Sequence, residues 1–126
     1  MAGDHQSTFA GNPLACAAGC VVAETVSDLN FLDKVNRKVE YIRSTIKSWN
    51  IPFIKEVRGR GLMIGSQIDS SINPADIKLR CLEEGLCVTT AGSDVVRFLP
   101  PLNISEKEID EGLAIFKRVL GEFAAK

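Results

Sequence analysis

The alternation of apolar and polar residues predicts a long amphipathic helix before the middle of the chain. Between residues 32 and 49 the apolar positions recur in steps of three and four, so they form one stripe along a helix. Asn30 is a plausible N-cap, and Pro52 stops any continuation. The stripe consists of Leu32, Val35, Val39, Ile42, Ile46 and Trp49. Off the stripe lie Arg37, Lys38, Arg43 and Lys47, which we expect to be solvated.

An earlier helix is predicted from Pro13 to about Ser27, after a polar loop formed by the first dozen residues. Asn12 is suited to cap this helix, and Pro13 fits its first position because the missing N–H would have no partner there. Its many alanines and its glycine would let another backbone approach closely. We therefore expect this helix to be buried.

The remaining chain alternates between pairs of strands and single helices. Apolar runs predict strands at residues 53–57 and 62–68 around the turn 59–61, and at 86–89 and 95–99 around the turn 91–94. Asn73-Pro74 begins a helix over residues 75–84 that Gly85 ends, and Ser105 with Glu108 forms a capping box for the last helix. The buried face of that last helix is predicted to be Ile109, Leu113, Phe116, Leu120 and Phe123.

This order of elements predicts an α/β fold of the α+β type, with a mainly antiparallel sheet and helices packed on it. The 126 residues, 45% of them apolar, suffice for one ordinary domain over residues 1–126. A net charge of -1 argues against nucleic acid or an anionic membrane as the main partner. The longest apolar stretch, residues 13–23, is about half of a membrane span and has no basic segment before it, so we expect neither a membrane helix nor a signal peptide.

The four cysteines have no CxxC spacing and lie among apolar residues, which favours free, buried thiols in a reducing cytoplasm. Cys16 and Cys20 are spaced like paired metal ligands. The single histidine, His5, lies in a separate loop and no acidic cluster completes a set, so we expect core packing and no metal site. The glycines of residues 59–65 have the wrong spacing for a dinucleotide motif and fit a hairpin turn instead.

Two places are candidates for anion binding. Residues 3–12 precede a helix N-terminus and offer hydroxyls and backbone N–H groups, which suits either a phosphate cradle or an ordinary capped loop. Arg97 is a lone cation in an apolar strand, so it either faces water or holds an anion with its planar fork of donors. No pairing of a nucleophile with a base is visible.

Three motifs, in order and together covering essentially the whole chain, resemble the signatures of the class III pyridoxal-phosphate aminotransferases. They are GDHQSTFAGNPLACAA at residues 3–18, VRGRGLMIG at residues 57–65, and TAG at residues 90–92 followed by VRFLPPL at residues 96–102.

The resemblance implies a role for several residues of these motifs. Thr8 would contact the phosphate of the partner subunit's pyridoxal phosphate across a homodimer interface, with Ser7 as its close neighbour. Arg97 would bind a carboxylate of the small-molecule substrate, an amino acid or 2-oxo acid, and His5 would position the loop. Gln6 and Ala10 stand where the family pattern commonly has glycine, which puts the details of the phosphate site in question.

The resemblance also implies a fold and a division of labour. The chain would be the small, C-terminal domain of a fold-type I aminotransferase, with residues 1–28 joining it to a large cofactor-binding domain that is its partner. The Schiff-base lysine and the carboxylate at the pyridine nitrogen would lie in that large domain, so none of the residues here would be catalytic and the chain alone would be inactive. A different hypothesis is a non-catalytic interaction module that associates through the small-residue helix.

Overall fold

A computed structural model describes residues 8–125 of the chain, which divides into two compact units, Met1–Lys34 and Val35–Lys126. Among residues 8–125, no single helix is long and apolar enough to cross a membrane. One bent pair of helices, Pro13–Ser27 with Leu29–Ser48, passes that test by length and composition only. The assignment of residues 1–126 to one domain stays a prediction.

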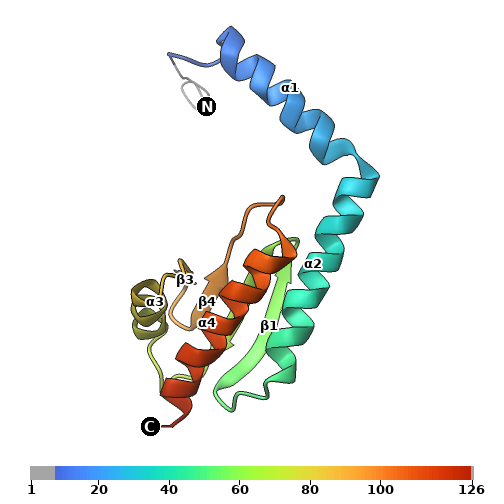
Figure 1. Cartoon of the computed structure of the whole chain (residues 1–126). Helices are drawn as coiled ribbons and strands as arrows, with labels where there is room; N and C mark the ends of the chain where they lie inside the picture. Colours follow the sequence, from blue (N-terminus) through green and yellow to red (C-terminus); the bar gives the residue numbers. More distant parts are fainter. Residues whose placement is uncertain (1–7, 126) are drawn as a thin grey trace. The chain divides into compact units, whose positions relative to one another are not determined.

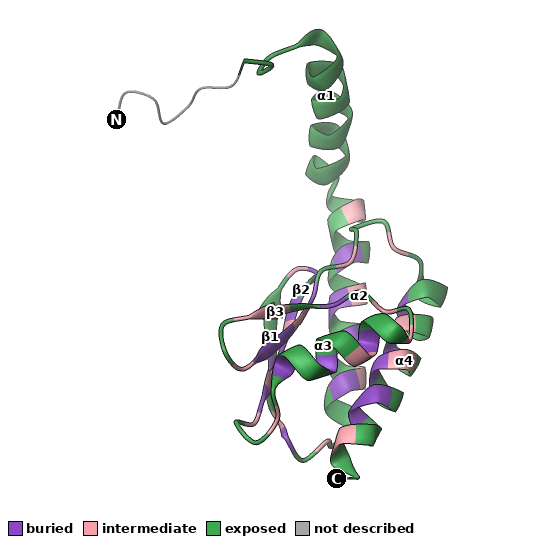
Figure 2. Cartoon of the chain, turned by 90° about the vertical axis from the view of Figure 1, so that its left-hand side faces the viewer, coloured by how far each residue is buried: buried purple, intermediate pink, exposed green. Residues whose placement is uncertain are grey.

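The first unit contains α1 (Pro13–Ser27), which begins as predicted. The Asn12 Oδ1 accepts a hydrogen bond from the Ala15 N–H at 2.9 Å, and Asn12 Nδ2 donates to the Phe9 carbonyl oxygen at 2.9 Å. None of the residues of α1 is buried, as the uniform green of this helix in Figure 2 shows. Our prediction that the helix is buried is therefore wrong for this chain, because nothing within the described residues covers its apolar side chains.

The long helix α2 (Leu29–Ser48) begins one residue before the predicted cap. Asp28 has the capping role expected of Asn30, because its Oδ1 accepts the Asn30 N–H at 2.9 Å. Four members of the predicted stripe are buried, whereas Leu32 is exposed and Trp49 is only partly buried. The buried members are Val35, Val39, Ile42 and Ile46.

Four strands form one antiparallel sheet in the order β1-β2-β4-β3, which confirms the predicted fold class. β1 (Ile54–Arg60) and β2 (Met63–Ile68) form one hairpin, and β3 (Thr89–Ala91) and β4 (Val95–Phe98) form the other. The first turn is shorter than predicted, since Gly59 and Arg60 belong to β1, and the register shifts between Ile54 and Glu56. The strand predicted at 86–89 begins only at Thr89, because the Leu86 N–H bonds back to the Cys81 carbonyl at 2.8 Å after the preceding helix.

The helices of the second unit pack against one side of this sheet (Figures 1 and 2). These helices are the part of α2 in this unit, α3 (Pro74–Glu83) and α4 (Glu106–Ala124). The predicted N-caps, Asn73 for α3 and Ser105 for α4, are confirmed. The ring of Phe98 meets that of Phe116 of α4 edge-on at 4.7 Å between centroids. Val119 of α4 is buried, whereas the predicted Phe123 is only partly buried.

Polar contacts fix the helices to one another at the surface. The Tyr41 hydroxyl of α2 donates to Asp110 of α4 at 2.6 Å, and Lys38 of α2, expected to be solvated, donates to the Ile104 carbonyl at 2.5 Å. Arg80 of α3 bonds Glu122 of α4 through two nitrogens, at 2.8 and 3.0 Å. These contacts orient the helices, while the buried apolar side chains supply most of the stabilisation.

The four cysteines are free thiols, but only Cys81 is buried. Cys16, Cys20 and Cys87 are exposed, so the prediction of buried thiols, and of core packing for the first two, is wrong for these three. Burial raises the pKa of the Cys81 thiol to about 11.

We expect Gly59→Ala to destabilise the chain by at least about 2 kcal/mol. Gly59 has a φ of +143°, and a Cβ there would lie 2.0 Å from the Met63 carbonyl oxygen across the hairpin. Gly121→Ala is the matched control, because Gly121 lies in α4 with open space around it and should gain roughly 0.5–1 kcal/mol. Urea unfolding followed by circular dichroism measures both; a Gly59→Ala chain as stable as the native one would contradict the hairpin geometry.

Cys81 should resist alkylation in the folded chain, whereas Cys16, Cys20 and Cys87 should react. Burial raises the pKa of the Cys81 thiol in the folded chain, so the stability that this thiol contributes is complete below pH 9. That contribution falls as the pH rises toward 11, because the same thiol ionises at a lower pH in the unfolded chain. Mass spectrometry after iodoacetamide treatment, with and without urea, gives the first result. Unfolding at pH 8 and pH 11 of the native chain and of Cys81→Ala gives the second, and a Cys81→Ala chain equally weakened by alkali would contradict it.

Candidate functional site

The helix-free face of the sheet presents one row of side chains across all four strands. Residues directly opposite each other in antiparallel strands project to the same face. Arg58 pairs with Gly65, Gly65 with Arg97, and Arg97 with Thr89, so these four residues form a single row. Their neighbours along the strands project to the helix-covered face.

Arg97 is held in this row by a reciprocal pair of hydrogen bonds with Thr89. Its Nε–H donates to the Thr89 Oγ1 at 3.1 Å, and the Thr89 hydroxyl donates to the Arg97 carbonyl oxygen at 3.3 Å. Arg97 is partly buried, and its two terminal nitrogens contact no carboxylate within the described part of the chain. The guanidinium is thus oriented by a neutral group, which leaves its fork of donors for an external carboxylate or phosphate.

Gly65 keeps the space beside Arg97 free of a side chain. A Cβ at this position would lie 2.9 Å from the Val95 Cγ1, a stiff branched side chain on the neighbouring strand. Close packing against Val95 therefore requires glycine here. One consequence is that no side chain separates Arg97 from Arg58 along the row.

Arg58 differs from Arg97 because its charge is already balanced. Its Nη1 donates to the Glu56 carboxylate at 2.7 Å and to the Gln67 Oε1 at 3.1 Å, and Gln67 Nε2 donates in turn to Asp94 at 2.8 Å. Sequence analysis missed this network and the role of Thr89. The alternation of Gly65 and Gln67 with buried Ile64, Ser66 and Ile68 is the signal that could have placed them on the open face.

The other predicted site lies in the first unit. Thr8 is exposed in the turn at residues 8–11 that leads to Asn12 and α1, and the first turn of α1 contains no acidic residue. A hydroxyl group and the N–H groups of a helix N-terminus are both groups that can bind a phosphate. Ala10 has no positive φ, so it replaces glycine here without backbone strain. Ser7, His5 and Gln6 lie outside the described residues, and Thr8 and Arg97 belong to different units.

Comparison with known proteins places the chain in a family. A sequence model described as "Aminotransferase class-III" matches residues 1–120. The acetylornithine aminotransferase of Caldanaerobacter subterraneus subsp. tengcongensis is 44% identical over 122 residues, which cover 95% of this chain and 31% of that protein. The chain therefore belongs to the class-III aminotransferases.

Solved structures agree with the fold. The N-acetylornithine aminotransferase of Stenotrophomonas maltophilia superposes with a TM-score of 0.84 at 33% identity, over 91% of this chain and 33% of that one. The ornithine aminotransferase of Toxoplasma gondii, described with partial occupancy of PLP at its active site, superposes with a TM-score of 0.82 at 32% identity, over 100% of this chain and 32% of that one. The chain thus spans about a third of the length of the relatives it matches.

Proposed function

We propose that this chain is the part of an acetylornithine-type aminotransferase that binds a substrate carboxylate. The parent enzyme would transfer an amino group between N-acetylornithine and 2-oxoglutarate. The observation that carries the proposal is Arg97, whose terminal nitrogens are free of carboxylates within the described chain while Thr89 fixes its plane. The names of the similar proteins support the choice of substrate.

Pyridoxal phosphate, when bound in such an enzyme, supplies the electron sink on which the amino group is transferred. This chain's contribution is binding and orientation. Arg97 would donate two parallel, charge-assisted hydrogen bonds to a substrate carboxylate and so fix the direction in which the amino or oxo carbon lies. Thr8, with Ser7 beside it in the sequence, would donate to the phosphate of the partner subunit's cofactor.

The proposal includes two partners. A large domain would carry the Schiff-base lysine and most of the cofactor site, and the intact enzyme would be a homodimer in the cytoplasm. On this view the chain alone does not turn over substrate. Ornithine, succinylornithine and 4-aminobutyrate are alternative amino donors, because each would place a carboxylate on the same arginine. The ornithine aminotransferase of Toxoplasma gondii matches this chain about as well as the acetylornithine enzyme does.

We expect Arg97→Ala, made in the intact enzyme that contains this chain, to weaken 2-oxo-acid use by roughly 2–5 kcal/mol in kcat/KM. The matched control is Arg58→Ala in the same row, whose guanidinium is already bonded to Glu56 and Gln67 and should matter much less. Steady-state kinetics with 2-oxoglutarate and with a monocarboxylate oxo acid provides the measurement. An unchanged KM and kcat for Arg97→Ala would contradict the assignment.

A second candidate function, a non-catalytic interaction module, is favoured by the exposure of α1. Leu14, Val21 and Val22 are exposed by 82%, 63% and 59%, and no residue of the helix is buried. An apolar surface of this kind normally has a partner.

If α1 drives self-association, the purified chain should elute as a dimer or larger species, and Val21→Glu should return it to a monomer. Val21 faces solvent, so the substitution leaves the core of the second unit untouched. Lys107→Glu is a control of larger charge change on the exposed face of α4 and should not alter the elution. Size-exclusion chromatography with light scattering measures the oligomeric state of each chain. A monomeric native chain would count against this alternative.

A further inference from the structure

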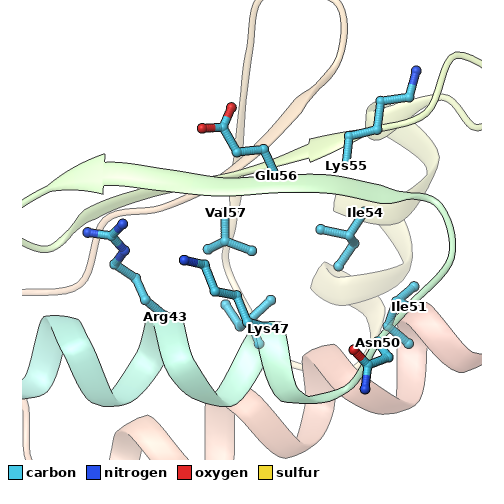
Figure 3. A pocket seen from close by; sticks show the side chains of 9 residues that line it. Arg43, Lys47, Asn50, Ile51, Ile54, Lys55, Glu56 and Val57 are labelled. Atoms are coloured by element: carbon cyan, nitrogen blue, oxygen red, sulfur yellow. The ribbon is translucent and has the colours of Figure 1, made fainter.

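A pocket between the last turns of α2 and the beginning of β1 is not used by the proposed function. It has a volume of about 520 Å³, within the range of small-molecule sites. Figure 3 shows Arg43 and Lys47 of α2 extending from the helix toward the strand, with Ile54 and Val57 of β1 facing them. β1 is an edge strand, so no further strand of the described sheet closes this side.

Of the three cations that line the pocket, Lys55 pairs with Asp69 at 2.8 Å, whereas Arg43 and Lys47 have no acidic partner among the described residues. Arg43 and Lys47 are four residues apart on one face of α2, where like charges destabilise a helix. Neither forms an ion pair within residues 8–125. The lining carboxylate, Glu56, lies on the other side of the strand in Figure 3 and bonds Arg58 at 2.7 Å.

The side chain of Arg43 is partly buried at the edge of the pocket. The Nε of Arg43 is shielded from solvent and has no hydrogen-bond partner in the described structure. This corrects the expectation that Arg43 is solvated. Because the Nε atom has no accessible surface, an anion in the pocket would bind the remaining, partly exposed part of the Arg43 guanidinium, which has no carboxylate partner within the described chain. A carboxylate or phosphate would accept charge-assisted hydrogen bonds from this guanidinium, and the same anion would offset its repulsion with Lys47.

One wall of the pocket is apolar and takes residues from both α2 and β1. Ile51 and Ile54 line it, together with the nearly fully buried Ile46 and Val57, while Asn50 adds one amide. A bare inorganic anion would leave this wall uncovered, whereas an anion with an apolar body would cover it.

We propose that this pocket binds a small organic anion, with its carboxylate or phosphate head on Arg43 and Lys47 and its apolar body on Ile51 and Ile54. The proposal is independent of amino transfer. It uses none of the residues of the row that contains Arg97, so either proposal can fail while the other stands.

The test is titration of the 126-residue chain by isothermal calorimetry, with circular dichroism confirming that each variant is folded. The probes are octanoate and octyl phosphate, with inorganic phosphate as the head alone and octanol as the body alone. We expect saturable binding of at least one of the two amphiphilic anions. Phosphate alone and octanol alone should each bind at least about tenfold more weakly than that anion. Whichever head binds more tightly identifies the anion class.

Variants locate the site. Arg43→Gln and Lys47→Gln should each weaken the amphiphilic anion roughly tenfold, and Ile54→Asn should weaken it while leaving phosphate unaffected. Lys78→Gln, on the exposed surface of α3, removes the same charge elsewhere and should bind like the native chain. Unchanged binding in both Arg43→Gln and Lys47→Gln, or no saturable binding by the folded native chain, would overturn the proposal; phosphate binding as tightly as octyl phosphate would also overturn it.

Discussion

The pairing of β2 with β4 is the contact on which the rest of the second unit depends. It joins two hairpins that are separated in the chain by α3, and it determines which residues face the helices. Ile64 opposite Phe98 contributes to the core, and Gly65 opposite Arg97 forms the open face. A shift of one residue in one strand would move its side chains to the wrong face, so Arg97 would enter the core or lose Gly65 as its neighbour. The register thus fixes the core and the candidate site together.

Local chemistry was readable from the sequence, whereas contacts between distant segments were not. The caps Asn12, Asn73 and Ser105 each act on a backbone group within three residues, and all three were predicted. Arg97 was found from its apolar neighbours and from a motif. Its partner Thr89 depends on strand pairing across a turn, and the strand containing Thr89 was predicted to begin at residue 86 because residues 86–88 are apolar.

Burial was the property most often predicted wrongly, since it depends on what covers a surface. The small residues of α1 suit close packing, yet nothing within the described residues covers them. Arg43 lies off the apolar stripe of α2, yet its side chain is partly buried and its Nε is shielded from solvent. Helical periodicity gives the direction of a side chain and not the distance to the next element. The assignments to Ser7 and His5 stay predictions from a motif.

The shift in register between Ile54 and Glu56 has a consequence for the edge of the sheet. An edge strand offers unpaired N–H and C=O groups on which another chain can add as a further strand. The irregular backbone at Lys55, followed by the charged side chains of Glu56 and Arg58, makes β1 a poor template for such an addition. The hairpin of β1 and β2, which contains Gly65, is thereby protected against edge-to-edge aggregation along β1.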